Sequence, residues 1–233
     1  MFRAGEASAA IAAYSAIVLS DCPPHAAFAI HNNRGALLLQ AGRASEALED
    51  FNAALVFTPN SLDALHNAAS TLRALGRGGE ALAQFQKCLE VEPQFYLALC
   101  GVAECYSMLS RFDEAVAAAT VAVVSDRGQA RAFVNRGFAK LKGGQQLKQQ
   151  GNAPTTAAEA TPPSSSSLSS AEAVADLEMA QSLGDSSAET DHLLALALAV
   201  EGDQRLAAGQ DAEAVTAYEK ALCHGEFVGV WVG

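Results

Sequence analysis

The chain has few aromatic residues and no long apolar run. Aromatics make up 6% of the 233 residues, with a single tryptophan, although half of all residues are hydrophobic. A β-sandwich core is rich in Val, Tyr and Trp, whereas abundant alanine favours helices that pack closely through small side chains. No stretch reaches the roughly 20 apolar residues that a membrane-spanning helix needs. We therefore expect a mostly helical protein without membrane insertion.

Basic residues are scarce in the second part of the chain. Residues 1–142 carry 12 Lys and Arg against 13 Asp and Glu, whereas residues 143–233 carry 3 against 13, a net charge of −10. Such a surface repels phosphate backbones and anionic membranes, which argues against nucleic acid as a partner. Both a basic partner and an acidic surface that merely keeps the protein in solution fit this pattern, and we favour the second.

The five cysteines include no CxxC pair, and the histidines do not cluster at ligand spacing. The sequence therefore predicts neither a disulfide framework nor a zinc site. Core packing is the expected role of Cys88, Cys100 and Cys105, and reduced thiols fit a cytoplasmic protein. Motifs of the types GxSxG, GxxxxGK and HExxH are missing, so we predict a protein without catalytic activity, metal or cofactor.

A motif of Glu, Ala and an aliphatic residue recurs along the chain. It reads EALEDF at 46, EALAQF at 80, EAVAAA at 114, EAVADL at 172 and EAVTAY at 213, with AAIAAY at 9 as a degenerate copy. Residues four and seven positions after each aligned alanine are mostly apolar, and these offsets place them on one helical face. A turn residue stands five positions before the aligned alanine: Gly5, Gly42, Gly76, Ser110 and Gly209. Each unit is therefore a helix, a tight turn and a second helix.

These units resemble the tetratricopeptide repeat (TPR) family. Residues 28–61 carry the family pattern with Gly35, Ala47, Phe51, Ala54 and Pro59, and later copies include Gly202, Ala214 and Tyr218. The resemblance implies an all-α fold, a right-handed α-solenoid of stacked antiparallel helix pairs. In this family the first helix of each pair lines a concave groove.

Interruptions of the register define the expected domain organisation. Residues 1–24 read as half a TPR unit with a second helix only, which we favour over a signal peptide. Residues 25–142 hold TPR units and the first helix of a fourth unit. Residues 143–170 are rich in Ser, Thr, Pro and Gly, and we expect a disordered insertion that serves as a tether or as a phosphorylated segment. Residues 171–233 hold the remaining TPR helices and an apolar tail, with the segment 184–195 lengthening the first helix of the last unit.

The resemblance directs the search for function to the first helices. Two positions before the small residue of each first helix stand Asn33, Asn67, Gly101, Asn135 and Val200. An asparagine amide presents a donor and an acceptor together, which suits the backbone of an extended peptide, and related TPR proteins use a ladder of asparagines in this way. We expect the peptide-binding groove to include Asn32, Asn33, His66, Asn67 and Asn135, with a rung missing at Gly101.

Other polar residues have ordinary interpretations. His31 also lies near the groove, but a histidine without a carboxylate or thiol partner is usually structural or solvated. Arg34 and Arg136 are expected to make surface ion pairs. The carboxylate clamp of chaperone-binding TPR domains is not expected, because Asp63 and Asn67 occupy the places of its Lys and Arg.

We expect a non-catalytic protein-protein interaction scaffold that binds an extended peptide or a helix in the groove. The alternative is the TPR portion of a larger enzyme or of a transport or assembly complex, separated from it by truncation. A third hypothesis is self-association through uncovered end helices. In each case the expected partner is a protein or peptide.

Overall fold

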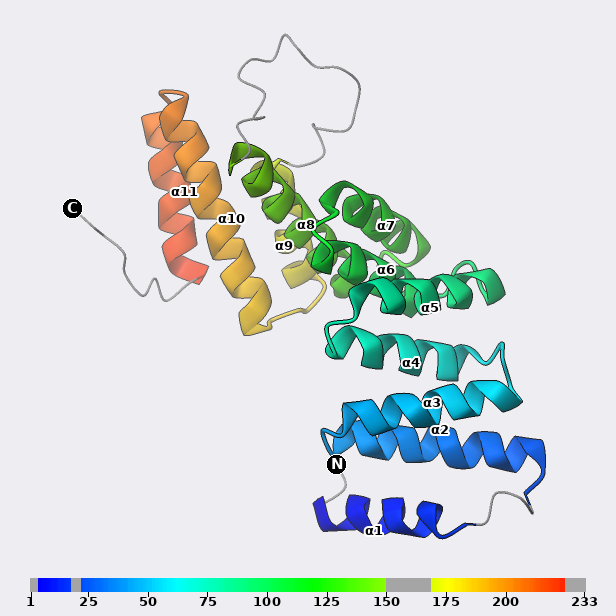
Figure 1. Cartoon of the computed structure of the whole chain (residues 1–233). Coiled ribbons are helices and arrows are strands. Elements are labelled where there is room, and N and C mark those ends of the chain that lie inside the picture. Colours follow the sequence, from blue (N-terminus) through cyan, green and yellow to red (C-terminus); the bar gives the residue numbers. More distant parts are fainter. Residues whose placement is uncertain (1–3, 18–21, 150–168, 225–233) are drawn as a thin grey trace. The chain divides into compact units, whose positions relative to one another are not determined.

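The computed structural model describes residues 4–17, 22–149 and 169–224, and all regular elements in them are helices (Figure 1). The helices are α1 (Ala4–Ser15), α2 (Pro24–Gln40), α3 (Ala44–Phe57), α4 (Leu62–Ala74), α5 (Gly78–Val91), α6 (Tyr96–Met108), α7 (Phe112–Ser125), α8 (Ala130–Gln149), α9 (Ser170–Ser182), α10 (Ala188–Ala207) and α11 (Asp211–His224). The predicted all-α class is confirmed.

The chain divides into two compact units, Met1–Leu109 and Ser110–Gly233. In the first unit α2 pairs with α3 and α4 with α5, and each pair packs on the next helix along the chain. In the second unit α8 pairs with α9 and α10 with α11 in the same way. Each unit is thus a stack of antiparallel helix pairs (Figure 1), as the α-solenoid prediction requires.

The turns inside the pairs use a left-handed residue to end the first helix. Gly42, Gly76 and Gly209 have φ of 75°, 76° and 73°. The next residue then bonds back into the helix, as where the Arg43 N–H donates to the Leu38 carbonyl at 2.8 Å. Glycine suits this position because it has no Cβ to clash at positive φ. Ser110 occupies the same position with φ 57°.

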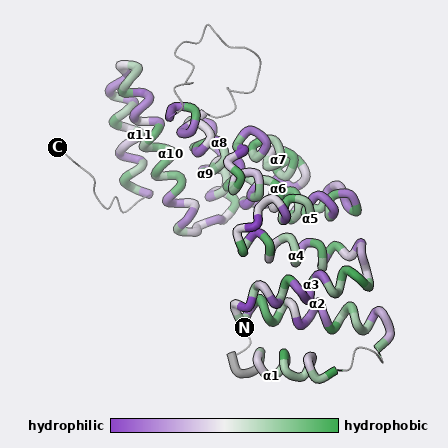
Figure 2. The backbone as a smooth tube through the Cα atoms, in the orientation of Figure 1, coloured by the Kyte–Doolittle hydropathy of each residue, from purple (hydrophilic) through white to green (hydrophobic). Residues whose placement is uncertain are grey.

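Small residues on the first helices let the aromatic residues of the second helices fit. Ala47, Phe51 and Ala54 of α3 are fully buried. A Cβ added at Gly35 would lie 2.8 Å from the Phe51 ring, so only glycine fits beside it. Hydrophobic and hydrophilic residues alternate along the helices (Figure 2). The motif that marks the repeats therefore packs the helices together.

One predicted boundary is wrong. Helix α8 continues to Gln149, so residues 143–149 are helical although we assigned them to the disordered insertion. Gly143 is buried in this extension, and Leu141 just before it belongs to the core of the second unit. The glycines at 143 and 144 suggested a break that packing against neighbouring helices overrides. Residues 150–168 lie outside the described residues.

Helix α10 is 20 residues long. It begins 14 residues before the small residue Gly202, whereas α4 begins seven residues before Ala69 and α8 seven before Gly137. The lengthening expected from segment 184–195 is therefore present at the start of the helix. The start of α10 is fixed by Ser187, whose hydroxyl accepts a hydrogen bond from the Thr190 N–H at 3.3 Å. The Thr190 hydroxyl donates a hydrogen bond to Asp185 at 2.7 Å.

Candidate functional site

Four of the five predicted groove residues lie in the first unit. Asn32 and Asn33 are on α2, and His66 and Asn67 are on α4. Asn135 lies half-buried on α8 of the second unit. The candidate site described here is therefore the polar surface formed by Asn32, Asn33, His66 and Asn67.

The asparagines of this surface bond to each other and to α1. Asn67 Nδ2 donates to Asn32 Oδ1 at 3.3 Å, which links α4 to α2. Asn33 is exposed, and its Nδ2 lies 3.5 Å from the Tyr14 hydroxyl. Each amide carries two donors and an acceptor, so these bonds use only part of its capacity. Within the described residues, no side-chain atom of Asn32 or Asn67 is both buried and unpaired, so their remaining polar atoms reach solvent.

His66 is held by aromatic neighbours. Its ring makes edge contacts with Phe85 and Phe95, at centroid distances of 5.9 and 5.8 Å. Its Nε2 lies 3.5 Å from the Ser70 hydroxyl. These contacts fix the orientation of the imidazole, and the residue is half-buried.

The absence of an asparagine at position 101 has a steric cause. A Cβ at this position would lie 2.4 Å from the Phe85 ring, closer than any real side chain allows. Phe85 is 1% exposed and cannot move aside. An asparagine is therefore incompatible with the aromatic that α5 places there.

The interpretation of His31 as a histidine without a carboxylate partner is wrong. Its Nδ1 lies 2.9 Å from Asp50 Oδ1, and both residues are buried. Arg34 donates to the same carboxylate through Nε at 2.7 Å and through a terminal nitrogen at 2.6 Å. Burial alone would raise the pKa of Asp50, but the hydrogen bonds from Arg34 and His31 outweigh it and lower the pKa. The cluster fastens α2 to α3.

The same arrangement recurs in the second unit. Arg136 of α8 donates to Asp176 of α9 at 3.0 and 2.6 Å, and the Lys140 ammonium lies 3.0 Å from the same carboxylate. Arg34 and Arg136 do form ion pairs, but their carboxylate partners are 5% and 7% exposed, so these are not surface pairs. They serve to hold each helix pair together.

Comparison of the repeats could have revealed these pairs. In both pairs the arginine stands one position before the small residue of the first helix, and the aspartate three positions after the aligned alanine. In the α4–α5 pair Ala68 takes the place of the arginine, and the buried Gln84 Oε1 at the acceptor position has no hydrogen-bond partner among the described residues.

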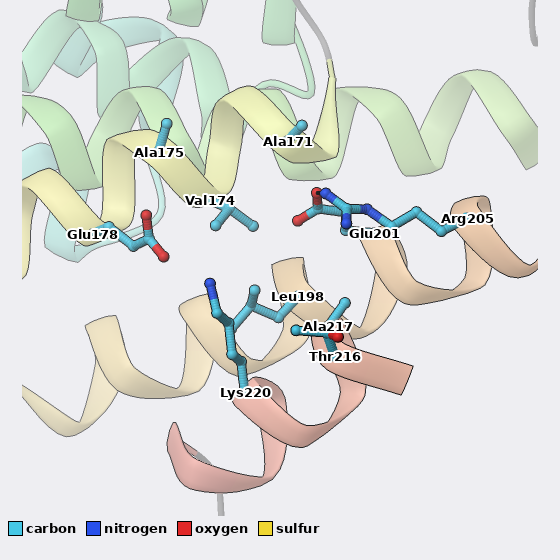
Figure 3. Close-up of a pocket in the computed structure, with 10 residues that line it drawn as sticks. All are labelled: Ala171, Val174, Ala175, Glu178, Leu198, Glu201, Arg205, Thr216, Ala217 and Lys220. Atoms are coloured by element: carbon cyan, nitrogen blue, oxygen red, sulfur yellow. Dashed lines mark hydrogen bonds and ion pairs between the residues drawn. The ribbon is translucent and has the colours of Figure 1, made fainter. Parts of the chain in front are cut away.

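A small pocket lies between α9 and α11 in the second unit (Figure 3). Residues of α10 line it as well. The lining combines apolar side chains such as Val174, Leu198 and Ala217 with the charged residues Glu178, Glu201, Arg205 and Lys220. Its volume of about 220 Å³ is below the roughly 300–1,000 Å³ of typical small-molecule sites. It is a packing gap between alanine-rich helices.

The cysteines of the core are unreactive in this environment. Cys88, Cys100 and Cys105 are fully buried, and all five cysteines are free. Burial raises the pKa of Cys88 and of Cys105 to about 11. At neutral pH these two thiols stay protonated, which fits their predicted role in packing.

Nowhere in residues 4–17, 22–149 and 169–224 do three or more His, Cys, Asp or Glu gather as possible ligands of a metal ion. Among the helices of these ranges, none combines the length and apolarity that crossing a bilayer requires.

A family model described as tetratricopeptide repeat matches residues 2–61 and 66–131, more than half of the chain. The chain belongs to the tetratricopeptide repeat family. Membership of this TPR family supports a role in binding other proteins. No curated protein shows a significant match to the chain.

Solved TPR structures share the fold. MamA from Desulfovibrio magneticus superposes with a TM-score of 0.61 at 17% identity, covering 85% of this chain and 94% of its own. A thermophilic TPR protein from Thermus thermophilus gives 0.54 at 22% identity, covering 86% and 93%. YrrB gives 0.57 at 14% identity, covering 85% and 87%. Identities this low establish the TPR fold alone.

Proposed function

We propose that this TPR protein is a non-catalytic scaffold that binds the backbone of an extended peptide across α2 and α4. The observation that carries the proposal is the amide pair of Asn32 and Asn67. Their mutual hydrogen bond occupies one donor of Asn67 and the acceptor of Asn32. It leaves the Asn67 oxygen to accept a peptide N–H and the Asn32 nitrogen to donate to a peptide carbonyl.

The neighbouring residues extend this surface. Asn33 is exposed on α2 and adds a third amide to the surface of Asn32 and Asn67. The ring of His66 offers an aromatic contact for a peptide side chain. Asn135 of α8 offers a similar amide in the second unit. Backbone recognition of this kind tolerates many sequences, which suits a scaffold. One of the similar structures, YrrB, is described as a TPR protein with an unusual peptide-binding site.

We further infer a cytoplasmic protein with a protein or peptide partner. The free thiols of all five cysteines support a reducing compartment. The acidic second part of the chain disfavours nucleic acid as a ligand.

The test is a selection of unstructured peptides from a display library against the protein. Replacing Asn32, Asn33 and Asn67 together by Ala should weaken binding of the selected peptides about tenfold or more, because several hydrogen bonds are lost. The matched control replaces Asn52 and Asn60, which are exposed and lie outside the first helices. Circular dichroism checks that both variants remain folded.

A second arm tests the backbone. Methylating the amide nitrogens of a selected peptide removes its N–H donors, so binding should disappear, whereas alanine at individual side chains should weaken it only modestly. Unchanged binding of the triple variant, or full affinity of the methylated peptide, would refute the groove assignment.

A further inference from the structure

Helix α11 exposes an apolar and acidic stripe formed by Asp211, Val215, Glu219 and Leu222. The offsets of four, four and three residues place these side chains on one helical face. Val215 is 55% exposed and Leu222 is 61% exposed. The face that packs on α10 is a different one, with Ala214, Ala217 and Ala221 buried.

The other repeats show what this face normally contacts. Val215 follows the aligned alanine Ala214, and five residues hold the same repeat position with exposures of 7–8%: Ile11, Leu48, Leu82, Val116 and Val174. Each lies on a helix against which the next helix along the chain packs: α1 against α2, α3 against α4, α5 against α6, α7 against α8 and α9 against α10. The stripe on α11 is thus a helix-binding face, and no helix of the described residues covers it.

The charges define the occupant. Asp211 and Glu219 are exposed and flank the two apolar side chains, and they lie in the part of the chain with a net charge of −10. A second copy packed antiparallel on the stripe would bring Glu219 near its symmetry mate, and like charges at that distance repel. A helix with Lys or Arg beside its apolar face would instead pair with both carboxylates.

We propose that the α11 stripe docks a basic amphipathic helix of a partner protein. Aliphatic residues of the partner contact Val215 and Leu222, and its basic residues reach Asp211 and Glu219. This surface is separate from the asparagine surface on α2 and α4, so a scaffold of this kind holds two partners of different chemistry.

The test uses a fluorescent 18-residue synthetic helix with leucines at i, i+3, i+4 and i+7 and lysines on the flanks. Its affinity for the full chain is measured by fluorescence anisotropy. Replacing Val215 and Leu222 together by Ser, or changing Glu219→Lys, should weaken binding about tenfold, as expected for central contacts of an interface. The matched control is Val56→Ser, which alters an apolar residue on α3 that is even more exposed (77%).

Both variants change exposed residues, and an unchanged melting temperature confirms that they fold. A peptide with glutamates in place of the lysines should bind much more weakly. Equal loss in the Val56 control, equal binding of the acidic peptide, or no binding of the basic one would overturn the proposal. Evidence for another occupant of the stripe would also overturn the proposal. A second copy of the chain would give a dimer in light scattering that the Val215 and Leu222 changes abolish. The chain's own residues 225–233 would be indicated by peptide binding that appears only after they are removed.

Discussion

The contact between Gly101 and Phe85 shows how one side chain decides which residue a repeat position accepts. The position holds asparagine in three other repeats, at Asn33, Asn67 and Asn135. At Gly101 the ring already occupies the space that a Cβ would need. The interruption of the asparagine series is therefore a consequence of packing.

Replacing Gly101→Ala should destabilise the protein by about 1–3 kcal/mol, because overpacking a filled core outweighs the better helix propensity of alanine. The matched control is Gly79→Ala, also in a helix, where an added Cβ meets nothing within 4 Å. This control should be neutral or slightly stabilising. Urea denaturation measures both, and equal effects would contradict the packing argument.

The buried cluster of His31, Arg34 and Asp50 makes stability depend on pH. The folded-state pKa of Asp50 is lowered, because the hydrogen bonds from Arg34 and His31 outweigh burial. The stabilisation is therefore present above the unfolded pKa, about 4 for Asp, and is lost as the pH falls through the folded pKa.

Asp50→Asn should lower the free energy of unfolding at pH 7 by about 1.5–3 kcal/mol, the range for hydrogen bonds to a charged group. The difference from wild type should begin to shrink below about pH 4, where the unfolded carboxyl takes up a proton. It should disappear as the pH falls through the lower folded-state pKa. The control Glu46→Gln removes an exposed pair with Arg43 and should have no measurable effect. A deficit that stays constant down to pH 2 would show that the ion pair is not its cause.

At the scale of the element, the turns follow from backbone geometry. Gly42, Gly76 and Gly209 have positive φ at the turn position, and Ser110 is the one non-glycine residue at positive φ among the described residues. A Cβ in the left-handed region costs energy that glycine avoids. The sequence already indicated this exception, since the glycine was missing from that copy.

Ser110→Gly should stabilise the protein by about 1 kcal/mol. The reverse change, Gly209→Ser, should destabilise it by a similar amount, since Gly209 has φ 73°. Thermal unfolding followed by circular dichroism measures both. The same sign in the two variants would contradict a conformational origin.

The α8–α9 pair depends on side chains more than the other pairs do. Its two helices are separated in sequence by residues 150–169, so no short turn holds them together. Arg136, Lys140, Asp176 and Glu172 form a network across the pair, alongside the shared apolar core. The ion pairs therefore take over part of the role of a turn.

A double-mutant cycle on Arg136→Ala and Asp176→Ala should give a coupling energy of about 1–3 kcal/mol. The comparison cycle on Arg111 and Glu114, a half-exposed pair on one helix, should give almost none. Similar coupling in both cycles would show that the buried position of Asp176 does not matter.

For the whole molecule, the repeat period and the apolar face of each unit were sufficient to predict the helices and their pairing. What they could not predict depends on contacts between helices. Gly143 ends no helix because α8 packs beyond it, and His31 appeared isolated because Asp50 lies 19 residues away in the sequence. For the candidate site, the sequence placed the asparagines on first helices but not the bond between Asn32 and Asn67.

Hydrogen exchange with and without a selected peptide tests the central claim most directly. If the peptide backbone binds the asparagine surface, amide protection should increase in residues 24–40 and 62–74, which form α2 and α4. The second helices α3 and α5 should change little. Protection confined to α3, α5 or α11, with none in α2 and α4, would contradict the account.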